Sequence, residues 1–138
     1  MSVILSGFKE RIGPLIDTLV DAYNKLDITK SGWQQLKLER PFGVITLNLW
    51  IGEALEMVEA LNSPCDAWFL DGHSPKKNPE IWREELLQAI GQKTKTGGTC
   101  ATFTVAGNVT RGLKSAGFKI EKCPSFAMKR SVLAGVKY

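Results

Sequence analysis

The sequence has 138 residues and a net charge of +4; 43% of its residues are hydrophobic and 23% are charged. This length suits one domain with its own core, and no apolar run approaches the roughly 18 residues of a membrane span. Three cysteines without a CxxC pair and a single histidine argue against a disulfide framework and predict no metal site. We expect a cytoplasmic protein without a signal peptide, because Met1 to Phe8 contain neither a basic leader nor a small-residue cleavage site.

Charge is distributed unevenly along the chain. The residues up to Asp71 include 6 basic and 10 acidic side chains, whereas the remainder includes 12 basic and 4 acidic ones. A basic second half is compatible with a polyanionic ligand such as RNA, which it would attract and neutralise. Ordinary solvated surface charge explains the same pattern equally well.

We expect one domain over residues 1–138, in which residues 1–43 form a helical amino-terminal segment. Apolar residues recur at helical spacing from Phe8 to Tyr23, with Pro14 in the first turn or at a kink. The segment from Trp33 to Leu38 fits either a second short helix or an extended strand.

Residues 44–138 are expected to form an α/β core. Strands are predicted at Val44 to Ile51, Ala67 to Leu70, Thr99 to Val105, Phe118 to Cys123 and Arg130 to Lys137, and helices at Ala54 to Leu61, Pro79 to Gly91 and Val109 to Ala116. The first strand and helix are interpreted as the start of a βαβ unit. The last two strands have no helix between them and should form an antiparallel hairpin. The predicted fold class is therefore an α/β, truncated Rossmann-like sheet, mostly parallel, with a carboxyl-terminal antiparallel hairpin.

The rest of the chain is organised around residues 66–79. Ala67 to Leu70 is a short apolar run, typical of a strand that is covered on both faces. The run stops at Asp71-Gly72, and Asn78 and Pro79 are suited to start the next helix. A carboxylate is thus predicted at the carboxyl end of a strand, where open α/β sheets hold their ligands.

Several motifs resemble those of one family. They are Asp66-Ala-Trp-Phe-Leu-Asp-Gly-His-Ser-Pro-Lys-Lys-Asn-Pro-Glu-Ile-Trp82, Gly97 to Gly107, Arg111-Gly-Leu113, Ala116-Gly-Phe118 and Lys129-Arg130. Together, from about Val44 to Gly135, they resemble the methyltransferase domain of the MnmC-like family. The resemblance implies a Rossmann-like domain that uses S-adenosyl-L-methionine to methylate the 5-aminomethyl group of a wobble uridine in tRNA. The product of that family is 5-methylaminomethyl-2-thiouridine.

The resemblance also implies site residues. Asp71 is the candidate catalytic base, which would take a proton from the attacking amine; its alternative role is to cap the following turn. Gly52, Glu53, Asp71 and Gly72 are candidate cofactor-binding residues, although Glu53 could equally be an ordinary helix-start glutamate. Trp68, Phe103 and Trp82 are expected in the core.

Contacts to the target base or to tRNA phosphates are predicted for one group of residues: His73, Ser74, Pro75, Lys76, Lys77, Arg111, Lys129 and Arg130. The family often has an aromatic residue where His73 stands, a difference that would alter base stacking there. For any single one of the basic residues, solvated surface charge is the competing explanation.

One departure from the family pattern stands out. No Gly-x-Gly turn follows a first strand, and Gly97-Gly98 precedes a strand instead of following one. The chain therefore looks like the methyltransferase domain without its amino-terminal cofactor half. Three hypotheses follow: an enzyme completed by a companion chain or an unusual homodimer, an inactive module that binds RNA or a protein, and a remnant without a biochemical role. An exposed sheet edge should be covered by the amino-terminal helix or paired with a second chain.

Overall fold

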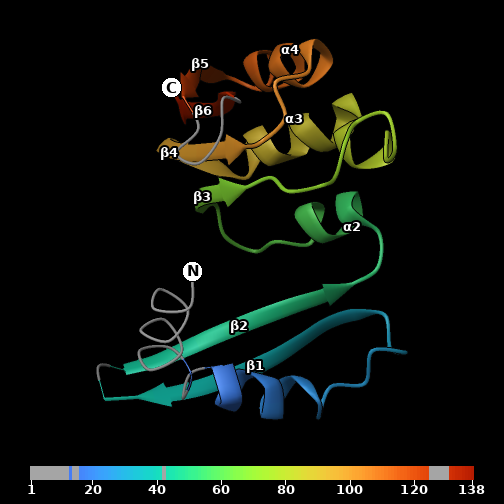
Figure 1. Cartoon of the computed structure of the whole chain (residues 1–138), viewed down its shortest axis with the longest axis vertical. Helices are drawn as coiled ribbons and strands as arrows, with labels where there is room; N and C mark the ends of the chain where they lie inside the picture. The colour runs from blue at the N-terminus through green and yellow to red at the C-terminus, as the bar shows by residue number, and fades with distance from the viewer. Residues whose placement is uncertain (1–12, 14–15, 42, 125–130) are drawn as a thin grey trace, which may run out of the picture. The chain divides into compact units, whose positions relative to one another are not determined.

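A computed structural model describes residues 13, 16–41, 43–124 and 131–138 of the chain (Figure 1). Contacts between Cα atoms divide the chain into two compact units, Met1–Gly52 and Glu53–Tyr138. No helix among the described residues is both long enough and apolar enough to cross a membrane. The candidate carboxylate, Asp71, belongs to the second unit.

The first unit contains a helix over residues 16–23 and an antiparallel hairpin of β1 (Gly32–Arg40) and β2 (Gly43–Ile51). The later part of the predicted helix is thus confirmed, whereas Phe8 and Pro14 lie outside the described residues. The segment from Trp33 to Leu38 is extended, which was one of its two predicted alternatives. It forms part of β1, so the described part of residues 1–43 is not helical throughout.

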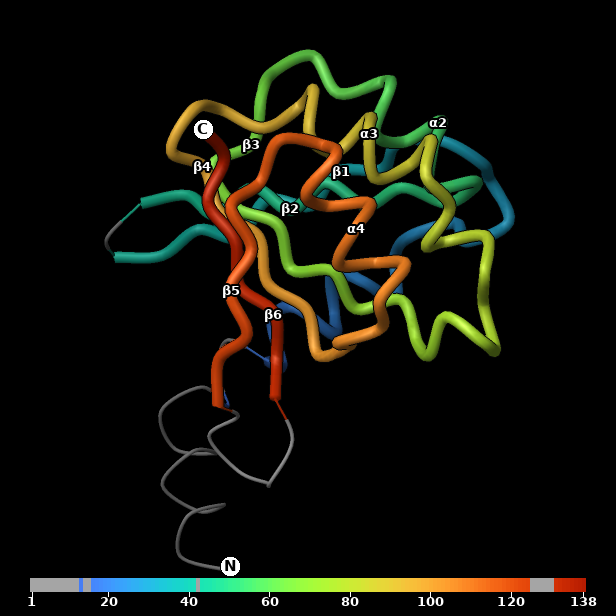
Figure 2. Tube along the Cα trace, turned by 90° about the horizontal axis from the view of Figure 1, so that it is seen from above, coloured from blue at the N-terminus to red at the C-terminus, as the bar shows by residue number. Residues whose placement is uncertain are grey.

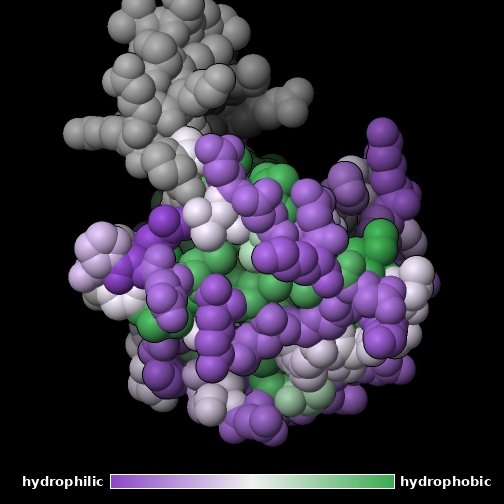
Figure 3. Space-filling model, turned by 90° about the horizontal axis from the view of Figure 1, so that it is seen from below, coloured by the Kyte–Doolittle hydropathy of each residue, from purple (hydrophilic) through white to green (hydrophobic). Residues whose placement is uncertain are grey.

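The β1–β2 hairpin is held by cross-strand side chains. Trp33 and Trp50 face each other in the ladder, with ring centroids 5.2 Å apart and planes at 66°. Leu36 and Leu38 are the only buried residues among the described part of this unit. Because only these two of its described residues are buried, the core of this unit is small. Seen from below, the molecular surface shows apolar residues between hydrophilic ones (Figure 3).

The predicted strand from Val44 to Ile51 exists, but its place in a βαβ unit was wrong. β2 pairs with β1 alone, in a two-stranded sheet separate from the sheet of the second unit. The physical reason is that β1 and β2 have equal length and are joined by a two-residue connection, which favours a local hairpin.

The second unit is built on a four-stranded sheet with the order β3-β4-β6-β5. Its strands are β3 (Cys65–Phe69), β4 (Thr94–Thr102), β5 (Phe118–Pro124) and β6 (Ser131–Lys137). β3 and β4 are parallel, while β6 is antiparallel to both of its neighbours. The predicted carboxyl-terminal hairpin is confirmed, but the expectation of a mostly parallel sheet was wrong. The sheet is mixed, because β6 returns between β4 and β5 and is antiparallel to both.

The helices of this unit are α2 (Ala54–Glu59), α3 (Glu84–Gln92) and α4 (Gly107–Ser115), and a 3-10 turn spans Glu80–Trp82. Asn78 does not cap α3 as predicted, because the 3-10 turn follows first and Arg83 occupies the capping position. Arg83 has an extended backbone (φ −66°, ψ 152°), which separates the 3-10 turn from α3.

The three helices lie on one face of the sheet (Figure 2). The largest fully buried side chains there are Phe118, Leu87, Leu113, Val58 and Val109. On the opposite face, which none of these helices covers, Phe69 is 87% exposed and Phe103 is 76% exposed. The expectation that Phe103 belongs to the core was therefore wrong. Trp82, at 6% exposure, does belong to it, and Trp68 is partly buried against the same core.

Candidate active site

The candidate site begins where β3 ends. The N–H of Leu70 donates to the carbonyl of Ala101 at 2.9 Å, which extends the pairing with β4 by one residue beyond Phe69. The next residue, Asp71, is exposed. The structure therefore places this carboxylate at the carboxyl end of a parallel strand, as the sequence predicted.

A tight turn follows Asp71. The N–H groups of Lys77 and Asn78 both donate to the carbonyl of Ser74, at 2.9 and 3.0 Å. The N–H of Lys76 donates to the Ser74 hydroxyl at 3.3 Å. Ser74 thus organises the turn, and the two lysines are carried at the surface.

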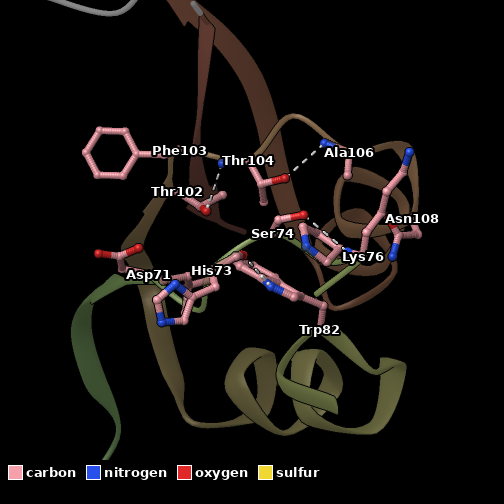
Figure 4. Close-up of a pocket in the computed structure, with 12 residues that line it drawn as sticks. Asp71, His73, Ser74, Lys76, Trp82, Thr102, Phe103, Thr104, Ala106 and Asn108 are labelled. Carbon is pink, nitrogen blue, oxygen red and sulfur yellow. Dashed lines mark hydrogen bonds between the residues drawn. The ribbon is translucent and has the colours of Figure 1, made fainter. Parts of the chain in front are cut away.

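An open hollow of about 600 Å³ lies between the segments that follow β3 and β4 (Figure 4). The first segment contributes Leu70, Asp71, His73, Ser74, Pro75 and Lys76; the second contributes Thr102, Phe103, Thr104, Ala106 and Asn108; and Trp82 also lines it. Both segments lie at the same end of the sheet because β3 and β4 are parallel.

The β4 side of the hollow is shaped by hydroxyl groups. Thr102 Oγ1 accepts from the N–H of Thr104, and Thr104 Oγ1 accepts from the N–H of Ala106, each at 3.3 Å. Neither these threonines nor Asn108 were predicted from the sequence. Both threonines fell within the predicted strand from Thr99 to Val105, whereas β4 ends at Thr102. The available signal was that the ends of parallel strands converge, which brings the end of this strand close to the Asp71 loop.

A second, smaller hollow of about 200 Å³ is lined mainly by apolar side chains of α2, β3 and α3. It shares Leu70, Asp71 and Trp82 with the larger hollow, and Gly72 also lines it. Asp71 therefore lies where two hollows adjoin, one open with polar edges and one apolar.

The loop after Asp71 has an unusual backbone. His73 has a φ of +60°, the only positive φ among the described non-glycine residues. A left-handed conformation costs an L-residue roughly 1–2 kcal/mol, and such residues persist where their surroundings hold them. Here the Trp82 indole N–H donates to the carbonyls of His73 at 3.0 Å and Gly72 at 3.3 Å.

Glu53 caps the amino terminus of α2. Its Oε2 accepts from the N–H groups of Leu55 at 2.8 Å and Glu56 at 3.2 Å, and its Oε1 accepts from Arg83 at 2.6 Å. Loss of solvation acts to raise the pKa of this carboxyl, but these hydrogen bonds and the Arg83 charge outweigh it and lower the pKa from its usual 4.5. The helix-start role of Glu53 is thus realised, and Glu53 lines neither hollow.

The remaining predicted residues are dispersed. Lys77 and Arg111 are exposed and do not line the two hollows, and Gly52 belongs to the first unit. Lys129 and Arg130 lie outside the described residues. Among the residues that the structure describes, no group of three or more His, Cys, Asp or Glu side chains could hold a metal ion.

Comparisons with known proteins agree with one another. A family described as S-adenosyl-L-methionine-dependent methyltransferase matches residues 14–138. The chain is 41% identical over 139 residues to the tRNA 5-methylaminomethyl-2-thiouridine biosynthesis bifunctional protein MnmC of Pseudoalteromonas translucida, covering 98% of this chain and 20% of that protein. It is 43% identical over 124 residues to the protein of the same name from a Marinomonas species, covering 90% and 18%.

A solved structure is similar as well. The crystal structure of MNMC2 from Aquifex aeolicus matches with a TM-score of 0.57 and 28% identity, covering 62% of this chain and 28% of that one. The chain spans about a fifth of the length of the curated relatives that it matches.

Proposed function

Because this chain belongs to the S-adenosyl-L-methionine-dependent methyltransferase family, we propose that it contributes the proton-accepting half of a site that methylates an amine on a tRNA uridine. The substrate class is taken from the two relatives, which are named for biosynthesis of 5-methylaminomethyl-2-thiouridine in tRNA. The chain covers a fifth of those proteins, so its activity is a proposal that rests on its own residues.

Asp71 carries the proposal, since it lies where the open hollow and the apolar hollow adjoin. S-adenosyl-L-methionine, when bound, supplies a methyl group on a positively charged sulfur. A nucleophilic amine must present an unprotonated lone pair to that carbon. The Asp71 carboxylate accepts a hydrogen bond from the amine, orients it and takes the proton that the nitrogen gives up when its bond to carbon forms.

The residues present fit only part of the cofactor. Asp71, Gly72 and the apolar walls of the smaller hollow would hold the portion near the transferred methyl group. The chain has no Gly-x-Gly turn for the methionine portion, and Glu53 is already engaged by Arg83 and by α2. We therefore propose that a companion chain completes the cofactor site. A second copy in a homodimer would pair with the sheet but has the same sequence and brings no such turn.

Exposed apolar residues on the described sheet of the second unit support association with another chain. Phe69 and Phe103 are exposed on the face that α2, α3 and α4 leave open, and β3 is an edge strand of its sheet. Parallel strands are usually buried on both faces, and open edges are normally paired or covered. Light scattering across a concentration series tests for a dimer; a strictly monomeric protein that gains no cofactor binding from any added chain would contradict this part.

For tRNA, we propose phosphate contacts from Lys76, Lys77 and Arg111, together with Lys129 and Arg130. His73, Ser74 and Pro75 would border the target base. Exposed lysines next to the open hollow support this arrangement. Such contacts weaken steeply with salt, so binding of tRNA should fall as salt rises and should weaken when Lys76 and Lys77 are both replaced by glutamine.

Calorimetric titration with S-adenosyl-L-methionine and its demethylated product is the direct test. With the completing chain present, we expect binding and, with a tRNA that carries the free 5-aminomethyl group, methyl transfer that Asp71→Asn abolishes. Asp66→Asn is the matched control, because Asp66 lies on β3, the strand that leads to Asp71, but pairs with Lys95 at 2.7 Å and lines neither hollow. Equal methyl transfer by the Asp71→Asn and Asp66→Asn variants would refute the assigned role.

A second candidate function is a binding module without chemistry. The exposed apolar sheet face favours it, because large exposed apolar patches mark interaction surfaces. Retained tRNA or partner binding, together with no heat and no melting shift at millimolar cofactor, would favour this candidate over the enzyme.

A further inference from the structure

The 3-10 turn and the residue after it contact both the loop that follows Asp71 and the start of α2. Ile81 packs against Gly72 so closely that a Cβ atom there would overlap its Cγ2. The Trp82 indole donates to two loop carbonyls. Arg83 pairs with Glu53 at 2.6 Å and with Glu80 at 3.2 Å, which ties the turn to the start of α2.

The Trp82 hydrogen bonds address a specific problem of this loop. Pairing with β4 ends at Leu70, so no N–H group of a neighbouring strand donates to the carbonyls of Gly72 and His73 in the described structure. Gly72 is buried, and a buried carbonyl without a donor is costly. With His73 at φ +60°, both carbonyls lie within reach of one N–H group.

We propose that Trp82 is a positioning residue whose indole N–H, beyond the bulk of its ring, sets the conformation of residues 71–73. Through this bond the turn determines where the Asp71 carboxylate and the His73 imidazole lie at the edge of the open hollow. Arg83 holds the turn in place through Glu53. A series of contacts through Glu53, Arg83 and Trp82 thus connects α2 to the loop of residues 71–73.

The test is Trp82→Phe, which removes the N–H and keeps an aromatic ring. The matched control is Trp68→Phe in β3, because the Trp68 indole donates to Thr94 Oγ1 at 2.9 Å and is not bonded to the loop. Two readouts need no activity. His73 is the only histidine, so its imidazole gives a single NMR signal, and the loop contains two trypsin sites at Lys76 and Lys77.

Loss of a donor to buried carbonyls should raise tryptic cleavage after Lys76 and Lys77 by about fivefold or more. Trp82→Phe should also shift or broaden the His73 signal, while Trp68→Phe leaves both readouts near wild type. If the two variants behave alike, or if Trp82→Phe matches wild type, the inference is overturned. If Trp82→Phe does not fold, Arg83→Met takes its place, with Glu80→Gln as the control. An unchanged His73 signal in Arg83→Met would overturn the inference.

A third measurement, of cofactor binding, rests on the proposed function. If wild-type protein binds S-adenosyl-L-methionine, Trp82→Phe should weaken that binding by about fivefold. If wild type does not bind, the proposed function fails for the isolated chain, but the NMR and trypsin readouts still decide whether Trp82 positions the loop.

Discussion

Replacing Gly72 by alanine is expected to destabilise the second unit, because no space is left there for a Cβ atom. An ideal Cβ would overlap Cγ2 of Ile81 and lie 3.2 and 3.3 Å from its Cδ1 and Cγ1 atoms. Ile81 is β-branched and stiff about χ1, and such overpacking costs about 1–3 kcal/mol. Alanine also lowers the entropy of the unfolded chain, which offsets about 0.4–1 kcal/mol and leaves a net loss of about 1–2 kcal/mol.

Position 81 offers a matched pair of compensating changes. Leucine lacks the Cγ2 branch but keeps the volume, whereas valine keeps Cγ2. Ile81→Leu should therefore restore most of the stability lost in Gly72→Ala, with a coupling energy of about 1 kcal/mol, and Ile81→Val should not. Urea unfolding followed by circular dichroism gives the free energies. Unchanged stability of Gly72→Ala, or equal rescue by leucine and valine, would refute the steric reasoning.

Three further predictions concern stability and reactivity. Phe118→Ala should lower the free energy of unfolding by about 3–5 kcal/mol because the Phe118 side chain is fully buried. Phe103→Ala, at an exposed side chain, should change it by about 0.5 kcal/mol or less. Similar losses in the two variants would contradict this. The lowered pKa of Glu53 means that its contribution to the stability of the folded state is present above pH 4.5 and is lost as pH falls through its folded-state pKa. Glu53→Gln should therefore flatten the decline of stability on the acid side. An unchanged slope in acid titrations of stability would count against this prediction. Burial raises the pKa of the Cys100 thiol to about 11, so at pH 8 a thiol reagent should modify it only after unfolding, as mass spectrometry of modified peptides can check; rapid labelling of folded protein would disprove the prediction.

Local patterns predicted the second unit well. The apolar run before Asp71 is a strand, and the two strands without a helix between them form the β5–β6 hairpin. The β1–β2 hairpin was harder to foresee, because glutamine and lysine alternate with apolar residues from Trp33 to Leu38 too briefly to separate a strand from a helix. Pairing is decided by the complementary partner strand, which a local pattern does not contain.

The candidate site was predictable only where it depends on a local pattern. Asp71 ends an apolar run, so its place at the end of β3 follows from the sequence pattern alone. The prediction for Glu53 rested on family position, and it could not foresee that Arg83, 30 residues later, would engage the carboxylate. Thr102 and Thr104 were overlooked because both fell inside the predicted strand from Thr99 to Val105, and hydroxyl residues near the end of a strand have no distinctive spacing.

Trp82 shows why a correct core prediction can hide a second role. Its spacing with Leu86 and Ile90 predicts burial, and the side chain is indeed buried. A buried tryptophan, however, must also direct its N–H to an acceptor, and the nearest unmet acceptors are carbonyls in loops that leave a strand. The Gly72-His73 loop lies only nine and ten residues earlier in the chain. A buried tryptophan that follows such a loop closely in the sequence is therefore a signal for this kind of contact, because its N–H needs an acceptor and the loop carbonyls need a donor.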